Sequence, residues 1–232
     1  MGANSATSSR TAALRTRLHY YATLLAAELT VILVYPFIVG SGEPQSVARL
    51  CGLIIFVAAI YGVLGMGRRT AIATALGVPA LLIHAINVAG YWLGLQTFAL
   101  VLGLLFLVFV TTVMIATILT DASVTTDTLA GAVSAYLLVG IMFGFAYTLI
   151  EQMAPGSFKD TIQPGKHFTQ PEFTFFSFVT LTTVGYGDIV PWGPHARAAA
   201  MLESVIGIMY PAVLIGRLVG LHGRKREDAG VS

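Results

Sequence analysis

Long apolar stretches separated by short polar segments dominate the chain. A helix needs about 20 mainly apolar residues to cross the hydrocarbon core of a bilayer. Stretches of that length predict six membrane-spanning helices, at residues 19–40, 48–66, 71–93, 97–120, 128–150 and 196–221. The pattern therefore predicts an all-α membrane protein with six transmembrane helices, and an even number of spans places both termini on one side of the membrane.

The stretch between the fifth and sixth spans breaks this pattern. Residues 151–171 are polar and contain two proline-glycine pairs, which is typical of an exposed loop. Residues 173–181 follow; they are apolar but only about half as long as a span requires. Lipid cannot satisfy bare backbone groups, so non-helical chain at this depth must be buried in protein or line a water-filled path. We expect a re-entrant pore helix here.

Composition and charge agree with a membrane location. Of the 232 residues 56% are hydrophobic and only 10% are charged, too few to solvate the surface of a water-soluble globule. A net charge of +2 gives no reason to expect a nucleic-acid partner. The basic residues that fall on the side of the termini are Arg10, Arg15, Arg17, Arg68, Arg69, Arg217, Arg224, Lys225 and Arg226, against Arg49, Lys159, Lys166 and Arg197 on the other. This asymmetry predicts cytoplasmic termini.

The string TLTTVGYGD, residues 180–188, follows the half-length apolar segment. Inward-facing backbone carbonyls can replace the water shell of a cation, which requires residues that alternate in handedness along the strand. Gly185 and Gly187 permit the positive φ angles that such a strand needs. Thr183 can add a hydroxyl at the inner end, while Val184 and Tyr186 can point away from the axis. The pattern predicts a cation filter.

The string Thr183-Val184-Gly185-Tyr186-Gly187-Asp188 resembles the signature of the tetrameric potassium channel family. The resemblance covers the outer helix, pore loop and inner helix, roughly residues 128–221. It implies a fourfold symmetric homotetramer in which potassium, the permeant ion rather than a cofactor, is bound by carbonyls. The implied filter residues are Thr183, Val184, Gly185, Tyr186 and Gly187, with potassium at the first four and support from Thr182 and Asp188.

The shell around the filter departs from one version of this family. Val179 and Phe176 stand where some members place a glutamate and a tryptophan that hold the filter aspartate. Neither residue can form a hydrogen bond with Asp188 through its side chain. We therefore expect a filter wall that is less tightly braced, with gating or inactivation at the filter.

The spans group into a peripheral domain, residues 19–120, and a pore domain, residues 121–222. Short cytoplasmic tails, residues 1–18 and 223–232, flank them. A voltage sensor needs several cationic side chains along one membrane helix. The fourth span, residues 97–120, has no charge before Asp121, so steep voltage dependence is not expected.

The last span contains a glycine and a proline one helical turn apart. Pro211 lacks an N–H, and its ring clashes with the carbonyl four residues back, which belongs to Gly207. A kink is expected there, and the place of Gly207 after the filter resembles the glycine hinge of potassium channel inner helices. The alternative is a closely packed glycine beside an incidental proline, since both are frequent in membrane helices.

Three ionisable residues fall inside predicted spans and are candidate functional sites for that reason. Glu28 and His84 lie at similar depth, so they could pair, and His84 could sense pH; alternatively, each is satisfied locally. Glu203 could accept a hydrogen bond from the pore-helix hydroxyls of Thr180 or Thr182.

The sequence favours passive, selective potassium conduction and leaves two alternatives. One is a potassium uptake transporter subunit, although such chains carry several degenerate pore loops and this one carries a single intact loop. The other is a modulatory subunit that needs a partner chain. The sequence contains no Ser/His/Asp grouping, metal-ligand spacing or phosphate loop, so an enzyme is not expected. A short tail and many alanines and glycines suggest a bacterial plasma membrane.

Overall fold

The computed structural model describes residues 20–39, 44–62, 68–88, 96–120 and 125–230. Most of them are helical, which confirms the all-α prediction. The helices are α2 (Tyr20–Val39), α3 (Pro44–Gly62), α4 (Arg68–Val88), α5 (Gln96–Thr120), α6 (Thr126–Met153), α7 (Gln170–Leu181) and α8 (Pro194–Gly230). Two short strands, β1 (Phe158–Asp160) and β2 (Ile189–Pro191), pair with each other.

Six long helices follow the predicted order, and α7 is the predicted half-length helix. Within the described residues α5, α6 and the first part of α8 are long and apolar enough to cross a membrane, whereas α2, α3 and α4 contain shorter apolar stretches. The crossing of the first three helices therefore stays a prediction. The helix α8 continues to Gly230, past the expected end of the last span at residue 221. The predicted N-terminal tail, residues 1–18, lies outside the described residues.

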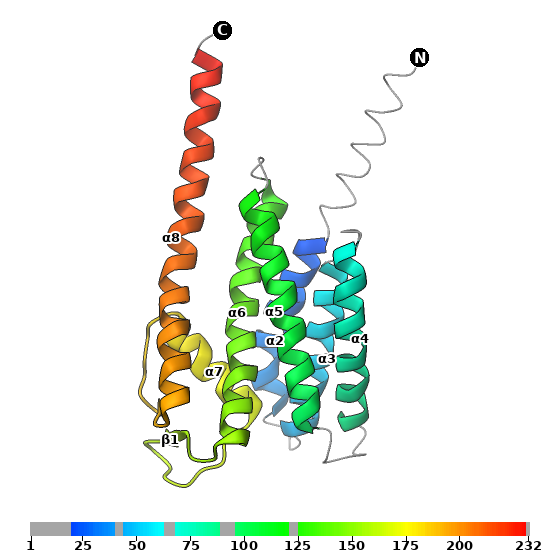
Figure 1. Ribbon diagram of the computed structural model, residues 1–232, viewed down its shortest axis with the longest axis vertical. Coiled ribbons are helices and arrows are strands. Elements are labelled where there is room, and N and C mark those ends of the chain that lie inside the picture. Colours follow the sequence, from blue (N-terminus) through cyan, green and yellow to red (C-terminus); the bar gives the residue numbers. More distant parts are fainter. Residues whose placement is uncertain (1–19, 40–43, 63–67, 89–95, 121–124, 231–232) are drawn as a thin grey trace.

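The helix α6 is the shared element of the molecule. It packs against α2 and α5 on one side and against α7 and α8 on the other. Figure 1 shows α2–α5 as a bundle beside α6, with α7 lying obliquely between α6 and α8. The start of α2 and the end of α8 lie at the same end of the molecule, and the strands lie at the opposite end.

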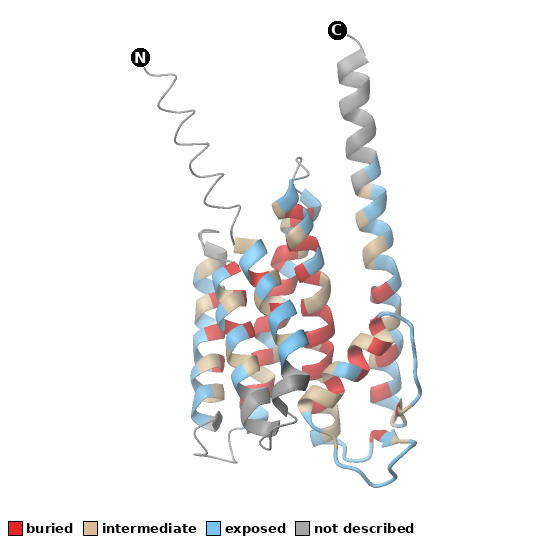
Figure 2. Ribbon diagram, turned by 180° about the vertical axis from the view of Figure 1, so that it is seen from behind, coloured by how far each residue is buried: buried red, intermediate tan, exposed pale blue. Residues whose placement is uncertain are grey.

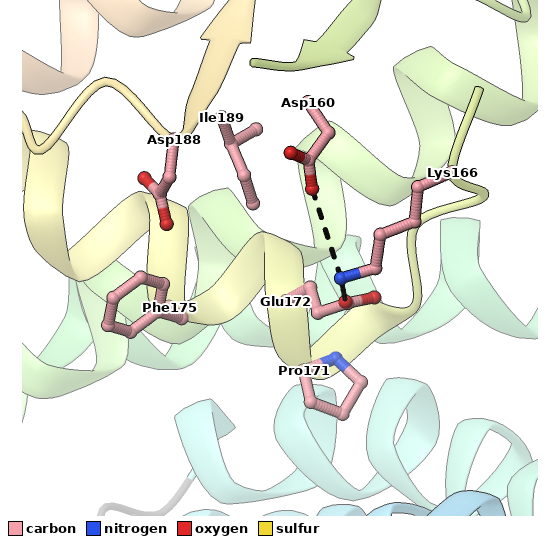
Figure 3. A pocket seen from close by; sticks show the side chains of 7 residues that line it. All are labelled: Asp160, Lys166, Pro171, Glu172, Phe175, Asp188 and Ile189. Carbon is pink, nitrogen blue, oxygen red and sulfur yellow. Dashed lines mark ion pairs between the residues drawn. The ribbon is translucent and has the colours of Figure 1, made fainter. Parts of the chain in front are cut away.

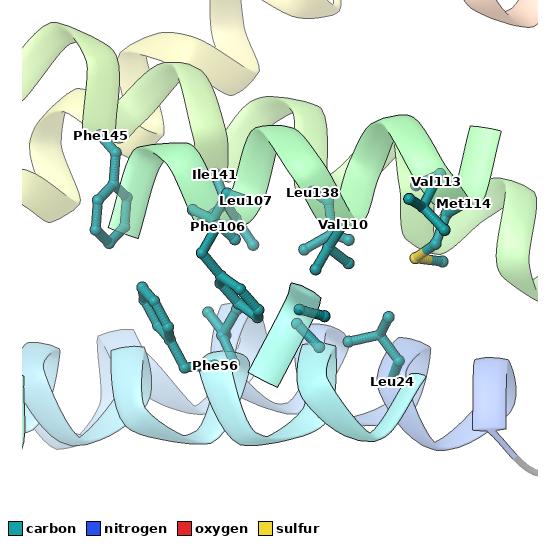
Figure 4. Close-up of a cluster of buried hydrophobic side chains, with 14 of the residues drawn as sticks. Leu24, Phe56, Phe106, Leu107, Val110, Val113, Met114, Leu138, Ile141 and Phe145 are labelled. Atoms are coloured by element: carbon teal, nitrogen blue, oxygen red, sulfur yellow. The ribbon is translucent and has the colours of Figure 1, made fainter. Parts of the chain in front are cut away.

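An aromatic cluster joins the bundle to α6 (Figure 4). The ring of Phe56 lies 5.2 Å from that of Phe106 and 6.0 Å from that of Phe145. A side-chain carbon at Gly103 would come within 3.0 Å of Phe56, so glycine makes room for these rings. The cluster fixes the peripheral helices against the outer helix of the pore region.

Two glycines set the distance between α6 and α7. Gly140 and Gly144 are four residues apart, so they share one face of α6. A side-chain carbon at Gly140 would lie 2.7 Å from Phe178, and one at Gly144 would lie 2.6 Å from Thr174 Oγ1. Small residues at this spacing allow helix backbones to approach closely. The pore helix therefore lies directly on the outer helix.

A second apolar cluster holds part of the loop that was predicted to be exposed. Most of residues 151–171 are exposed, as expected, but Phe158 is buried and its ring meets Tyr147, Phe173 and Phe176 edge-on. The strand β1 pairs antiparallel with β2, with Phe158 opposite Pro191. The loop is thereby tied to the chain that leaves the glycine-rich string.

Candidate functional site

The backbone after α7 alternates in handedness, as the sequence predicts. Thr183, Gly185 and Gly187 have positive φ angles of 61°, 59° and 78°, whereas the two residues between them do not. A β-branched residue such as threonine rarely adopts a positive φ. Backbone strain of this kind persists only where the surrounding structure imposes it, and it clusters at functional sites.

The inner end of this segment is tied to α7 through its amides. The Thr183 amide donates to the Thr180 carbonyl at 3.0 Å, and the Val184 and Gly185 amides donate to the Val179 carbonyl at 2.9 and 3.3 Å. The Thr182 hydroxyl donates to the Phe178 carbonyl at 2.6 Å. The pore helix therefore fixes the start of the segment.

Four consecutive carbonyls remain unoccupied within the described part of the chain. Those of Thr183, Val184, Gly185 and Tyr186 accept no hydrogen bond there, whereas the next two carbonyls do. The segment is exposed, and the four acceptors can therefore take a ligand from outside this chain. A row of backbone oxygens suits a hard cation.

Large apolar side chains beside these carbonyls are exposed on the single chain. Val184 is 54% exposed and Tyr186 is 70% exposed, with its ring stacked 6.2 Å from Phe175. The first half of α8 presents further apolar side chains, namely Met201, Leu202, Val205, Ile208 and Met209 (Figure 2). A surface of this kind faces lipid or other copies of the chain.

The outer end of the segment borders a pocket of about 230 Å³ (Figure 3). Its charged lining residues are Asp160, Lys166, Glu172 and Asp188. Lys166 Nζ lies 2.5 Å from Glu172 Oε1 and 3.9 Å from Asp160 Oδ2. Hydrogen bonds from the Gln163 and Ile162 amides, together with Lys166, lower the pKa of Asp160. The hydrogen bond to Glu172 raises the pKa of Lys166.

Comparison with known proteins shows what this region is similar to. A family model described as an ion channel matches residues 135–221. This part of the chain is similar to the ion channel family. The match covers α6 from Ala135 onward, α7, the glycine-rich segment and most of α8, the region in which the sequence resembles potassium channels.

Individual relatives of this ion channel region are potassium channels from distant organisms. An inward rectifier potassium channel, Kirbac3.1 of Paramagnetospirillum magnetotacticum, is 35% identical over 82 residues, which are 34% of this chain and 24% of the relative. The voltage-gated potassium channel protein shk-1 of Caenorhabditis elegans is 31% identical over 80 residues, 34% of this chain and 15% of the relative. The two pore potassium channel c of rice, Oryza sativa subsp. japonica, is 33% identical over 87 residues, which are 37% of this chain and 17% of the relative.

The chain thus spans a quarter or less of the length of these relatives. No solved structure matches it significantly.

On α8, Gly207 lies against the end of α7. A side-chain carbon there would lie 2.0 Å from the Leu181 carbonyl oxygen. The Tyr136 hydroxyl donates to the same oxygen at 3.3 Å. The helix α8 continues without interruption through Pro211. This contact supports the close-packing alternative for Gly207, while the hinge itself stays a prediction.

Glu203, one turn before Gly207, has other partners than those expected. Its carboxylate accepts hydrogen bonds from the hydroxyls of Ser177 on α7 and Tyr147 on α6, not from Thr180 or Thr182. Thr182 bonds within its own helix end instead. The Glu203 side chain is fully buried. Glu203 therefore does accept a hydrogen bond from a hydroxyl on α7, as expected. The donor is Ser177 and not the predicted Thr180 or Thr182, because Ser177 is on the face of α7 turned toward α8.

Of the two alternatives for Glu28 and His84, a pair with each other is wrong, because Glu28 has its partner on α6. Glu28 Oε2 accepts a hydrogen bond from the Ser134 hydroxyl on α6 at 2.7 Å. His84 lies beside α3 instead, with its ring 6.0 Å from Phe56 and its Nε2 where a side chain at Gly52 would be. Glu28 and His84 thus have different neighbours although they lie at similar depth in the sequence prediction.

Three residues of this site were not singled out from the sequence. Tyr147 and Ser177 donate the hydrogen bonds that Glu203 accepts. Their hydroxyls lie on largely apolar helices, and this feature of the sequence could have indicated a buried polar contact. Thr161 contacts the outer end of the glycine-rich segment. A threonine in a polar loop carries no such signal, because its role depends on the pairing of β1 with β2.

Proposed function

We propose that this protein is a potassium-selective channel subunit that conducts passively through a filter of backbone carbonyls. The observation that carries the proposal is the row of four carbonyls, residues 183–186, that accept no hydrogen bond within the described chain. The alternating φ angles and the match of residues 135–221 to the ion channel family support it. Potassium would bind at these carbonyls and at the Thr183 hydroxyl, with Gly187 at the outer end.

The filter requires several copies of the chain. One copy supplies one carbonyl at each level, and a cation needs a ring of them. The exposed apolar side chains of Val184 and Tyr186 would be covered by neighbouring copies. A closed ring of identical chains is the expected symmetry, and we propose a homotetramer.

The peripheral helices would not confer steep voltage dependence. Moving one elementary charge through 100 mV supplies about 2.3 kcal/mol. The helix α5, which occupies the place of the predicted fourth span, has no charged residue. We propose a plasma membrane location, bacterial by composition, with both termini in the cytoplasm; the shared position of the start of α2 and the end of α8 supports this orientation (Figure 1).

Ion flux into liposomes tests the function. The purified protein would be reconstituted alone, and potassium flux would be compared with sodium flux, with barium as blocker. Potassium flux that exceeds sodium flux and stops with barium is the expected result. Absence of flux from a verified tetramer would contradict the proposal and favour a subunit that needs a partner chain.

A matched pair of glycine variants connects the flux to the filter. Gly185→Ala places a side chain on a residue with φ of 59°, and Gly156→Ala does the same in the outer loop at φ of 85°. Both substitutions add about 1–2 kcal/mol of backbone strain. Potassium flux should fall at least tenfold in Gly185→Ala and stay within about twofold in Gly156→Ala. An equal fall of potassium flux in both variants would mean that backbone strain alone causes the loss of flux in Gly185→Ala.

A further inference from the structure

The chain that leaves the filter is held by the outer loop rather than by the pore helix. The Thr161 amide donates to the Asp188 carbonyl at 2.8 Å, and the Thr161 hydroxyl donates to the Gly187 carbonyl at 2.7 Å. Within the described residues no hydrogen bond reaches the Asp188 carboxylate. Val179 and Phe176 leave the pore helix without a donor for it, so the outer end of the filter has a different brace.

Thr161 is itself fixed by its surroundings. It directly follows β1, whose pairing with β2 places Asp160 opposite Ile189 (Figure 3). Asp160 Oδ1 accepts hydrogen bonds from the Ile162 and Gln163 amides at 2.8 and 2.7 Å, which shapes the turn after Thr161. The threonine therefore stands directly after a paired strand, at the start of a turn that Asp160 closes.

A second set of contacts links this turn to the start of the pore helix. Lys166 bridges Asp160 and Glu172. Glu172 Oε2 in turn accepts a hydrogen bond from the Thr169 amide at the beginning of α7, at 2.7 Å. The filter is thus attached to α7 at both ends, directly through its inner amides and indirectly through the loop at its outer end.

We propose that Thr161 is a positioning residue that holds the outer end of the filter in its conducting shape; this rests on the proposed channel function. By occupying the Gly187 carbonyl, its hydroxyl keeps that oxygen out of the ion path and leaves residues 183–186 as the ion ligands. Loss of the hydroxyl frees the carbonyl to rotate. The expected consequence is faster entry into a non-conducting filter state.

Two substitutions at this position separate the hydroxyl from the shape of the side chain. Thr161→Val keeps the shape and the amide donor but removes the hydroxyl, and Thr161→Ser keeps the hydroxyl. Currents of the full chain in planar bilayers should decay roughly two- to tenfold faster in Thr161→Val, as expected for one neutral hydrogen bond. Higher external potassium should slow the decay, and Thr161→Ser should match the parent protein.

A control and a supporting variant complete the test. Thr97→Val removes an exposed hydrogen bond, from Thr97 Oγ1 to Gln152 Oε1 at 3.3 Å, away from the filter, and should leave the decay unchanged. Lys166→Met breaks the link between Asp160 and Glu172 without touching Thr161, and should accelerate the decay by less than Thr161→Val does. Decay in Thr161→Val equal to that of the parent, or decay in Thr161→Ser as fast as in Thr161→Val, would overturn the proposal.

Amide hydrogen exchange gives a readout that does not require conduction. The amides of residues 188–190 should exchange faster in Thr161→Val than in the parent or in Thr161→Ser, and unchanged exchange would count against the brace. A parent protein that conducts no potassium would contradict the channel function, whereas a conducting parent with unaltered Thr161→Val kinetics and exchange contradicts only the role of Thr161.

Discussion

Glu203 joins three helices through one buried carboxylate. Its oxygens accept hydrogen bonds from Ser177 on α7 and Tyr147 on α6. Glu203→Ala would leave the buried Tyr147 hydroxyl without this partner, at a cost of roughly 1–3 kcal/mol, whereas Ser177 would keep its hydrogen bond to the Gly140 carbonyl at 2.6 Å. Glu203→Gln keeps an acceptor, and its amide group can donate to the other hydroxyl oxygen. We expect a marked fall of the melting temperature in Glu203→Ala and a small one in Glu203→Gln.

The neighbouring serine provides the control for this experiment. Ser204 donates only within its own helix, to the Ala200 carbonyl at 2.9 Å, so Ser204→Ala should melt like the parent protein. Thermal unfolding of the detergent-solubilised protein measures all three variants. If Glu203→Ala had the same melting temperature as Ser204→Ala, the Glu203 carboxylate would not be holding the helices together.

The turn that the ionised Asp160 carboxylate stabilises should stay formed over a wide pH range. Hydrogen bonds from the Gln163 and Ile162 amides lower the pKa of Asp160 below its ordinary 3.8, so its contribution is present above pH 3.8 and is lost as the pH falls through the lowered pKa. The Glu172 hydrogen bond raises the pKa of Lys166 above 10.5, so that contribution is present below pH 10.5 and is lost as the pH rises through the raised pKa.

Protection of the Ile162 and Gln163 amides from hydrogen exchange, corrected for the intrinsic pH dependence of exchange, reports on this turn. Protection should stay constant between about pH 5 and pH 9 and should fall in strong acid. Asp160→Ala should remove it at every pH, and a gradual loss between pH 7 and pH 5 would show that the carboxylate is not stabilised as described.

At the scale of elements, α8 offers a direct test of packing against hinge motion. In Gly207→Ala the added methyl group would clash with the Leu181 carbonyl oxygen. This oxygen belongs to the backbone, so it can move only if the end of α7 moves as well. Overpacking of this kind costs about 1–3 kcal/mol. Gly207→Ala should therefore lower the melting temperature and the yield of assembled protein, while Pro211→Ala should leave both nearly unchanged.

The hinge hypothesis predicts a different outcome for the same two variants. Both would then reduce the open probability in bilayer recordings while the melting temperature stays that of the parent. Destabilisation confined to Gly207→Ala assigns the glycine to close packing, and matched gating defects in two stable variants assign it to a hinge.

The elements themselves were largely predictable, whereas the partners of polar side chains were not. Apolar length located the long helices to within about five residues, apart from the end of α8, because the bilayer requirement acts on the sequence directly. Alternation of handedness was predictable because Gly185 and Gly187 readily adopt the positive φ angles that the alternation needs. The partners of Glu28 and Glu203 depend on which faces of two helices meet. Neither these contacts nor the pairing of Thr161 with the filter could be deduced from spacing along the chain.

At the scale of the whole molecule, α6 connects two parts with different surfaces. The bundle of α2–α5 packs its aromatic cluster against α6. The pore part, by contrast, exposes the filter and much of α8 on the single chain (Figure 2). The proposed conduction path is therefore open on one side of the single chain, and the proposed homotetramer would supply the missing walls.

Potassium should stabilise the assembly if four copies form the filter together. An ion that binds the assembled state and not the separated chains stabilises the former by about 2.7 kcal/mol at 100 times its dissociation constant. The temperature at which the tetramer dissociates should rise with potassium and not with equal sodium, and Gly185→Ala should abolish the difference. Light scattering of the protein in detergent should give the mass of four 24.6 kDa chains. A smaller assembly, or equal stabilisation by both ions, would contradict a shared carbonyl filter.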